Sequence, residues 1–222
     1  MDENQIILID KPSGISSFGV VAKVRANLRD KFGHKVKVGH TGTLDPFATG
    51  LLILLSGKMT KKSSNFLKLD KTYEATLKLG YTSTTGDPEG EIQLYSNEGS
   101  PELDEYTDIS LALNSFVGKI EQTPPRFSAI KINGQRAYKL ARKGQDFKIP
   151  SRKVEIYSID ILDYNYPELR IRVHCSSGTY IRTLAEDIGK KLGTGAYLTE
   201  LRRTQIANYN VKDAHPLSDF TK

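Results

Sequence analysis

The sequence predicts an α+β fold in which strands and helices follow one another irregularly. Residues 72–79 and 169–175 alternate apolar with polar side chains, the two-residue period of half-buried strands in an antiparallel sheet. Residues 17–33 and 181–193 instead repeat their apolar side chains every three or four positions, which is the period of a helix. Because no regular strand–helix–strand rhythm is visible, the pattern favours α+β over a doubly wound parallel sheet.

Polar residues and glycines predict where the helices begin and end. Ser17 is expected to cap the first helix, which stops near Gly33, and Gly193 is expected to end the helix that follows the turn at residues 176–178. A third helix is expected to open at Thr107 or Asp108 and to close at Gly118. The apolar residues expected on one face of this third helix are Ile109, Ala112, Leu113, Phe116 and Val117.

Composition excludes several classes of protein. The chain has 222 residues, 38% of them hydrophobic and 26% charged, which is typical of a globular chain long enough to bury a core. Its longest apolar run, residues 51–55, is far shorter than the ~20 residues that a membrane-spanning helix needs, and we expect no secretory signal. The single Cys175 excludes an internal disulfide and fits a reducing cytoplasm. The four histidines show no metal-ligand spacing.

Charge is concentrated in one segment. Residues 119–153 contain ten basic residues and two acids, a net charge of +8 against +6 for the whole chain. Phe127, Tyr138 and Phe147 lie among them. Such a segment suits RNA, because cations neutralise phosphates and aromatic rings offer stacking faces. It would equally suit a solvated surface loop, and charge alone does not separate these two interpretations.

The stretch at residues 39–50 is the first candidate site. Three glycines and Pro46 fix a loop just before the apolar run at 51–55, so a ligand could approach the backbone closely. Asp45 is the only carboxylate of the loop and His40 its only imidazole. The loop lacks the lysine of a phosphate-binding P-loop. The alternative is structural: Asp45 and Pro46 would start a turn, and His40 would only hydrogen-bond within the loop.

Residues 178–183 form a second candidate site, where a strand passes into a helix. Tyr180 and Arg182 flank the apolar Ile181, so neither need lie in the core. Both could face an anionic ligand; alternatively, Arg182 is a surface residue and Tyr180 a partly buried ring. Hydrolytic chemistry fits poorly, because Asp45 has no visible carboxylate partner for glycoside hydrolysis and the sequence has no Gly-x-Ser-x-Gly elbow.

Several motifs, taken in order, resemble one family. They run from about residue 5 to about residue 210, and their combination is specific where any single one would be weak. They are Lys11-Pro12-x-Gly14-x-Ser16-Ser17, Gly39-His40-Thr41-Gly42-Thr43-Leu44-Asp45-Pro46, Lys71-Thr72-Tyr73, Thr85-Gly86-Asp87-x-x-Gly90, residues 124–138, residues 175–182 and Leu201-Arg202-Arg203. This series closely resembles the TruB family of tRNA pseudouridine synthases.

The resemblance implies an isomerase that needs no cofactor and no metal. Such enzymes detach the uracil of a uridine, typically uridine 55 in the T-loop of tRNA, turn it and rejoin it through C5. Asp45 matches the catalytic aspartate, as nucleophile or base. The residues implied to bind the substrate are Tyr73, which stacks on the target base, Tyr180 and Leu201, which line its pocket, Arg182, which pairs with the catalytic aspartate, Asp87, an active-site acid, and His40, which fills the space left by the flipped base.

The resemblance also implies the surroundings of this site. Its fold would be the pseudouridine synthase fold, a central, mainly antiparallel sheet flanked by helices, crossed by a cleft where Asp45, Tyr73, Tyr180 and Arg182 converge. The basic segment at about 119–153 matches the RNA-gripping thumb loop, long in the bacterial branch. Its RNA-binding residues would be Lys131, Arg136, Tyr138, Lys139, Arg142 and Lys143.

We therefore expect one catalytic domain over residues 1–222, with no C-terminal PUA domain apparent. The expected partner is the T-arm of tRNA, with no membrane and no metal, and the expected protein is a cytoplasmic monomer. Two alternatives stay open at this point. One is a non-catalytic RNA-binding or RNA-folding module, and the other is the same chemistry on another RNA, such as ribosomal RNA.

Overall fold

The computed structural model of the chain describes residues 2–95 and 107–221 and divides into two compact units. Unit 1 consists of Met1–Tyr73 and Leu201–Lys222, and unit 2 of Glu74–Glu200. Two strands, β4 (Lys71–Leu79) and β12 (Ala196–Ile206), have residues in both units. Unit 2 is therefore a continuous stretch of chain, whereas unit 1 is assembled from two stretches.

Unit 1 is built around strand β3. Its elements are β1 (Ile6–Lys11), α1 (Ser17–Phe32), β2 (Val38–His40), β3 (Thr49–Ser56), the 3-10 helix η1 (Gly57–Lys62), α2 (Ser63–Leu67), β13 (Tyr209–Asn210), η2 (Val211–Asp213), β14 (His215–Pro216) and η3 (Leu217–Phe220). The strands are ordered β14-β1-β3-β12, and β2 pairs with β3 as well. The β1–β3 and β2–β3 pairs are antiparallel, and the β12–β3 pair is parallel.

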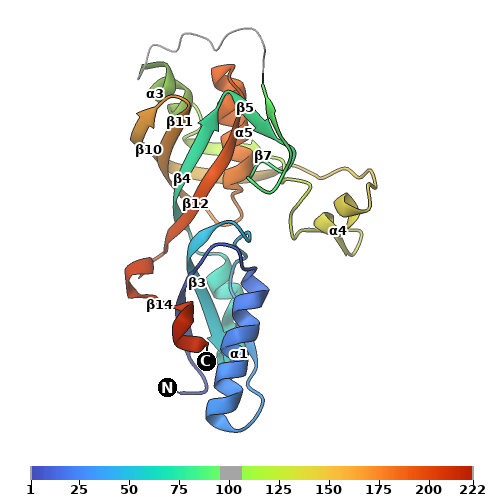
Figure 1. The fold of residues 1–222 in the computed structure, drawn as a ribbon, viewed down its shortest axis with the longest axis vertical. Coiled ribbons are helices and arrows are strands. Elements are labelled where there is room, and N and C mark those ends of the chain that lie inside the picture. Colours follow the sequence, from blue (N-terminus) through green and yellow to red (C-terminus); the bar gives the residue numbers. More distant parts are fainter. Residues whose placement is uncertain (1, 96–106, 222) are drawn as a thin grey trace. The chain divides into compact units, whose positions relative to one another are not determined.

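The apolar run at residues 51–55 is explained by burial of β3 on both faces. Leu52 and Leu54 belong to a core cluster shared with the buried side of α1, which lies alongside β3 in Figure 1. Leu51, Ile53 and Leu55 pack on the other side, with Ile206. A strand covered on both faces has no polar side to alternate with, so its sequence reads as continuously apolar.

Helix α1 confirms the predicted helix but not its predicted cap. Ser16, rather than Ser17, is the N-cap: its side chain accepts a hydrogen bond of 3.0 Å from the backbone N–H of Gly19. Ser17 is instead buried beneath the loop that carries Asp45. Gly33 ends the helix as predicted, with a φ of +74° and its N–H bonded to the carbonyl of Arg29.

Unit 2 contains the rest of the sheet. Its own elements are β5 (Tyr81–Ser83), β6 (Ile92–Leu94), α3 (Thr107–Asn114), β7 (Gly118–Gln122), β8 (Lys131–Ile132), β9 (Gln135–Arg136), α4 (Ala137–Arg142), β10 (Arg152–Asn165), β11 (Glu168–Cys175) and α5 (Ile181–Leu192). The main strands are ordered β12-β4-β11-β10-β7, and β10 pairs antiparallel with both of its neighbours. In β4 and β11 every second residue is buried, which confirms both predicted strands and the mainly antiparallel sheet.

The two longer helices of unit 2 agree unequally with their predictions. Helix α5 ends at Gly193 as expected and buries its apolar stripe. Helix α3 stops at Asn114, four residues before the predicted end, so Phe116 and Val117 lie outside it. Phe116 and Val117 form i→i−3 turn hydrogen bonds, and Gly118, at φ +106°, starts strand β7 opposite Ile156. Pairing in the sheet thus ends the helix early.

Within the described residues, no helix is long and apolar enough to cross a membrane. The same part of the chain holds no group of three or more His, Cys, Asp or Glu side chains placed to bind a metal ion.

Candidate active site

Asp45 lies in unit 1, in the loop between β2 and β3. The residue before it, Leu44, is clamped by the buried hydroxyl of Ser17, which accepts from the Leu44 N–H at 2.8 Å and donates to the Leu44 carbonyl at 3.0 Å. The carbonyl of Asp45 itself accepts from the N–H of Ala48 at 3.2 Å. The turn predicted at Asp45 and Pro46 is therefore present, and the carboxylate stands on a fixed backbone.

A buried lysine holds the other side of Asp45. The Lys11 side chain is fully buried, and its ammonium donates to the carbonyls of Pro46, Ile15 and Pro12 at 3.0, 2.7 and 2.9 Å. The Pro46 carbonyl also accepts from the N–H of Gly14 at 2.9 Å. A buried ammonium is tolerated only when its donors are satisfied, and here one of its acceptors belongs to the residue next to Asp45.

Arg203 on β12 ties the start of the same loop to β3. It is almost completely buried, and its guanidinium donates to the carbonyl of Leu51 at 2.7 Å and to that of Gly42 at 3.1 Å. Gly50 is required for this approach, because a Cβ there would lie 2.3 Å from the Arg203 carbonyl oxygen. Lys11, Ser17 and Arg203 occur in the recognised motifs, but no sequence signal indicated a role for Lys11 or Arg203, and Ser17 was expected only to cap α1. Each is a polar residue at a position buried by the fold.

His40 closes β2 and is kept neutral by its surroundings. Burial and the positive charge of Arg203 lower the pKa of its imidazole from 6.5. Its Nδ1 accepts a hydrogen bond from the Gly42 N–H at 3.4 Å, and its ring contacts the ring of Phe18 edge to face, with centroids 4.9 Å apart. An uncharged flat ring suits insertion between bases.

The remaining predicted residues of unit 1 are Tyr73 on β4 and Leu201 on β12, and both are buried. Lys71, two residues before Tyr73, is buried as well and donates to the carbonyls of Leu67 and Leu69. The start of β4 is thus anchored to the segment that follows α2, which fixes the position of Tyr73 within this unit.

Unit 2 contains Arg182 and Asp87. Of the two placements that the local pattern left open for Arg182, the surface position is wrong, because the residue is 3% exposed. Its guanidinium pairs with the Asp87 carboxylate at 3.1 Å and donates to the carbonyls of Thr85 and Phe127 at 2.9 and 2.8 Å. These acceptors come from segments far apart in the sequence, so the local pattern around Ile181 could not show that the charge would be satisfied in the interior.

Asp87 is itself positioned by its neighbours. Its carboxylate accepts from the Thr85 hydroxyl at 2.6 Å and from the Glu89 N–H at 3.0 Å. Asp87 therefore acts on Arg182 as a fixed buried counter-charge. The role of an active-site acid, which the resemblance implies, stays a prediction.

Tyr180 precedes α5 and is held by its backbone. Its N–H donates to the side-chain oxygen of Gln122 at 2.8 Å, and its carbonyl accepts from the side-chain nitrogen of the same residue at 3.0 Å. The Arg152 guanidinium lies 4.7 Å from the centre of the Tyr180 ring and donates to the Gly178 carbonyl. The ring is thus half-buried under a cation.

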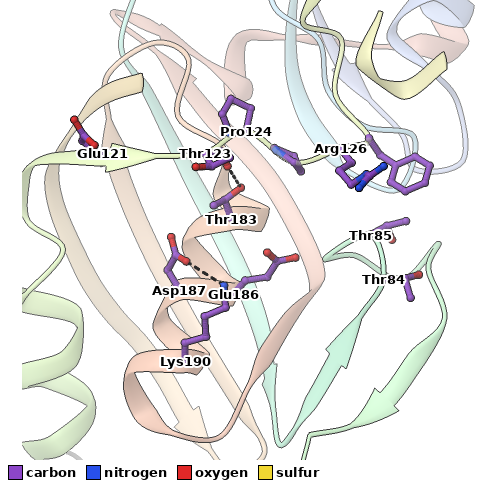
Figure 2. Close-up of a pocket in the computed structure, with 12 residues that line it drawn as sticks. Thr84, Thr85, Glu121, Thr123, Pro124, Arg126, Thr183, Glu186, Asp187 and Lys190 are labelled. Carbon is purple, nitrogen blue, oxygen red and sulfur yellow. Dashed lines mark hydrogen bonds and ion pairs between the residues drawn. The ribbon is translucent and has the colours of Figure 1, made fainter. Parts of the chain in front are cut away.

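A polar pocket of about 460 Å³ adjoins the Arg182 carbonyl partners Thr85 and Phe127. Figure 2 shows it between α5, which contributes Thr183, Glu186 and Lys190, and the segment from Glu121 to Arg126. Thr183 donates to the Thr123 carbonyl across one end at 3.4 Å. Burial raises the pKa of the Glu186 carboxyl, against the opposing charge of Lys190.

The basic segment at 119–153 belongs to unit 2 and is more structured than a loop. It contains the β8–β9 hairpin, which turns at Asn133 and Gly134 with positive φ, and helix α4. Arg126 closes the segment by donating to Asp146 and to the Gln145 carbonyl, with its guanidinium 4.9 Å from the Phe147 ring centre. The predicted RNA-binding cations on it are all exposed: Lys131, Arg136, Lys139, Arg142 and Lys143. Tyr138 is partly buried beneath Arg142, whose guanidinium is 5.7 Å from its ring centre.

The structure thus divides the predicted residues between its two units. Asp45, His40, Tyr73 and Leu201 belong to unit 1. Asp87, Tyr180, Arg182 and the basic segment belong to unit 2. Convergence of the two groups around one base stays a prediction from the resemblance.

Comparison with known families decides among the open interpretations. A model described as TruB family pseudouridylate synthase (N terminal domain) matches residues 29–181. The chain belongs to the TruB family. Residues 182–222 match a model described as tRNA pseudouridylate synthase B C-terminal domain. The predicted extent of the catalytic domain, residues 1–222 without a PUA domain, stays a prediction.

Individual TruB proteins and solved structures agree with this assignment. The tRNA pseudouridine synthase B of Phocaeicola vulgatus is 46% identical over 221 residues, which cover 98% of this chain and 92% of the relative. A structure titled as a Cbf5-Nop10-Gar1 complex is 29% identical with a TM-score of 0.72, and one titled as an H/ACA RNP bound to a substrate RNA is 27% identical with a TM-score of 0.69. Each match covers 98% of this chain, which spans about half of the matched chains (53% and 52%). The chain is a pseudouridine synthase, an isomerase, with the fold that its motifs predict.

Proposed function

We propose that this TruB protein isomerises uridine to pseudouridine at position 55 in the T-loop of tRNA, with Asp45 as the catalytic residue. Membership of the TruB family and 46% identity to a tRNA pseudouridine synthase B support the reaction and the substrate class. The observation that supports Asp45 is its fixed backbone: Ser17 and Lys11 hold the residues on either side of it.

The reaction balances without a cofactor. The bond between N1 of uracil and C1′ of the ribose breaks, the base turns within the site, and C5 forms the new bond to C1′. C5 then loses its proton and N1 gains one, so no atom and no electron is exchanged with another reactant. A carboxylate serves this chemistry as nucleophile at the sugar or as base.

The base must leave the stack before any of these steps. An enzyme cannot reach the glycosidic carbon of a base inside a structured loop, so the nucleotide is flipped out. His40 offers a neutral ring to fill the vacated space, and the resemblance implies that Tyr73, Leu201 and Tyr180 contact the flipped base. It also implies that Arg182, which Asp87 holds, pairs with the catalytic aspartate.

The basic segment of unit 2 grips the T-arm. Its exposed cations contact phosphates, which gives affinity without reading sequence. One of the similar structures is described as bound to a substrate RNA, which supports an RNA-binding role for the shared fold. The protein acts as a monomer, and it acts in the cytoplasm. A molar mass of twice that of one chain, measured by light scattering, would contradict the monomer.

The deciding experiment is an assay for pseudouridine in a T-arm hairpin and in full-length tRNA. Because the product has the mass of the substrate, it is detected by chromatography of the nucleosides after digestion. We expect product from wild type and none from Asp45→Asn, whose unfolding midpoint stays at the wild-type value. A hairpin with cytidine at position 55 should also give none. Product from Asp45→Asn, or wild-type product only from ribosomal RNA, would contradict the proposal.

A further inference from the structure

Phe18 is an exposed aromatic side chain on a rigid part of unit 1. It is 69% exposed, although it lies in the first turn of α1 between Ser17, which is buried, and Gly19. Ser16 caps the helix at this point, and a Cβ on Gly19 would lie 2.7 Å from the Ile15 side chain. The backbone that presents the ring is therefore closely packed, whereas the ring itself faces solvent.

The one aromatic neighbour of this ring among the described residues is His40. The two ring centroids are 4.9 Å apart with an angle of 81° between the planes. His40 is the side chain that fills the place of the flipped base in the proposed function. A base next to the position that the flipped base leaves would therefore be close enough to contact Phe18.

The segment of chain that carries Phe18 and leads to His40 is strongly basic. Residues 17–38 contain six lysines and arginines and one acid, a net charge of +5. The Arg25 guanidinium donates to the Val38 carbonyl at 3.2 Å, which ties α1 to β2, the strand that ends at His40. All six cations are exposed: Lys23, Arg25, Arg29, Lys31, Lys35 and Lys37. A solvent-facing ring on a segment rich in exposed cations matches a nucleic acid, which offers bases to the ring and phosphates to the charges.

We propose that Phe18 adds a second stacking surface next to His40, nearly perpendicular to the imidazole ring, and that an unpaired base of the RNA loop next to the flipped nucleotide stacks on it. The cations of residues 17–38 face the phosphates of the same RNA. This inference rests on the proposed function, because it takes the RNA loop as the occupant. It makes Phe18 a further substrate-binding residue, and it makes α1 a second RNA-contacting element in addition to the basic segment of unit 2.

The test compares Phe18→Ala with Phe18→Tyr, which keeps a stacking ring, and with Leu111→Ala as the matched control. Leu111 is 65% exposed on α3 of unit 2 and has no part in the proposed stacking surface. Binding is measured with T-arm hairpins that carry 2-aminopurine at one loop position each, because the fluorescence of this base falls when it stacks. Pseudouridine formation is measured on the unlabelled hairpin.

We expect Phe18→Ala to weaken hairpin binding at least about fivefold, the loss that follows from removing one stacked base. At one loop position the fluorescence change on binding should disappear in Phe18→Ala and persist in Phe18→Tyr and Leu111→Ala. Wild-type affinity in Phe18→Ala, or an equal loss in Leu111→Ala, would overturn the inference and leave Phe18 as a surface for another partner. Failure of the proposed function is distinguishable, because wild type itself would then form no pseudouridine.

Discussion

Arg182 and Asp87 form an ion pair of 3.1 Å between two side chains that are each only about 4% exposed. The pair is closed by hydrogen bonds on both sides: Arg182 donates to two backbone carbonyls, and Asp87 accepts from Thr85 and Glu89. The guanidinium therefore has one available orientation at the start of α5. A cation fixed in this way can act on a carboxylate or a substrate without first being ordered.

Removing one partner of this pair should damage both stability and turnover. We expect Asp87→Ala to lower the free energy of unfolding by about 3–5 kcal/mol, because it leaves a buried guanidinium without its counter-charge. Urea unfolding measures this. Asp30→Ala is the control, since it breaks the exposed 2.9 Å pair with Arg29 and should cost at most about 1 kcal/mol. The milder Asp87→Asn should keep the fold and lose most of kcat. Wild-type kcat in Asp87→Asn would show that Arg182 needs no counter-charge.

Replacing Ser16 and Ser17 one at a time should separate an effect on catalysis from an effect on stability. Ser17→Ala leaves the buried N–H and carbonyl of Leu44 without their partner, which should cost about 1–3 kcal/mol and lower kcat, because Asp45 loses its support. Ser16→Ala removes the N-cap of α1, which should lower the free energy of unfolding by about 1 kcal/mol and leave kcat within about twofold of wild type. Both variants are compared at a temperature where each is fully folded. Equal kcat values in the two would contradict the clamp on Asp45.

Four cations of the basic segment should account for much of the salt dependence of RNA binding. Replacing Lys131, Lys139, Arg142 and Lys143 by Ala should weaken T-arm binding and reduce the slope of log K against log salt by roughly 0.7–0.9 for each phosphate that is no longer neutralised. The matched control replaces four exposed lysines near α2, namely Lys58, Lys61, Lys62 and Lys68. Binding is measured between about 50 and 200 mM salt. An unchanged slope in the first variant would return the segment to the interpretation of a solvated surface loop.

Glu186 should make the stability of the protein depend on pH. Its pKa is raised in the folded state, so its contribution is fully present below pH 4.5 and is lost as the pH rises through the folded pKa. Glu186→Gln stays neutral at every pH. The difference in unfolding free energy between variant and wild type should therefore shift in favour of the variant from pH 4 to pH 8. Chemical denaturation at each pH checks this, and a difference that does not change with pH would contradict the burial of the ionised form.

Local pattern predicted the regular elements well and the polar interior poorly. The alternation in β4 and β11 and the glycine that ends α5 are properties of neighbouring residues, so they can be read from the sequence. The choice of Ser16 over Ser17 as N-cap was missed, because Ser17 is engaged by Leu44, 27 residues away. The burial of Arg182 was missed for the same reason, since its acceptors are 55 and 97 residues away in the sequence. The early end of α3 depends on the pairing of β7 with β10, which no local pattern shows.

The site residues divide in the same way. The local pattern made Asp45 and Arg182 candidates, but their predicted roles, and Tyr73 as a candidate at all, come from the resemblance of whole motifs to a known family. Lys11 and Arg203 lay within those motifs without an assigned role. The fold buries both charged side chains against backbone carbonyls. Since every residue has a carbonyl, the sequence does not indicate which ones accept these hydrogen bonds.

Because unit 1 is assembled from two stretches of the chain, its two parts are synthesised at different times. The carbonyls of Leu51 and Gly42 accept hydrogen bonds from the guanidinium of Arg203, which lies about 150 residues further along the chain. At roughly 5–20 residues per second, a ribosome needs about 8–30 s to make that stretch. The loop that carries Asp45 therefore emerges early but acquires its last anchor late, after all of unit 2 has been translated. An unfinished chain released before Arg203 would carry Asp45 on a loop that lacks this support.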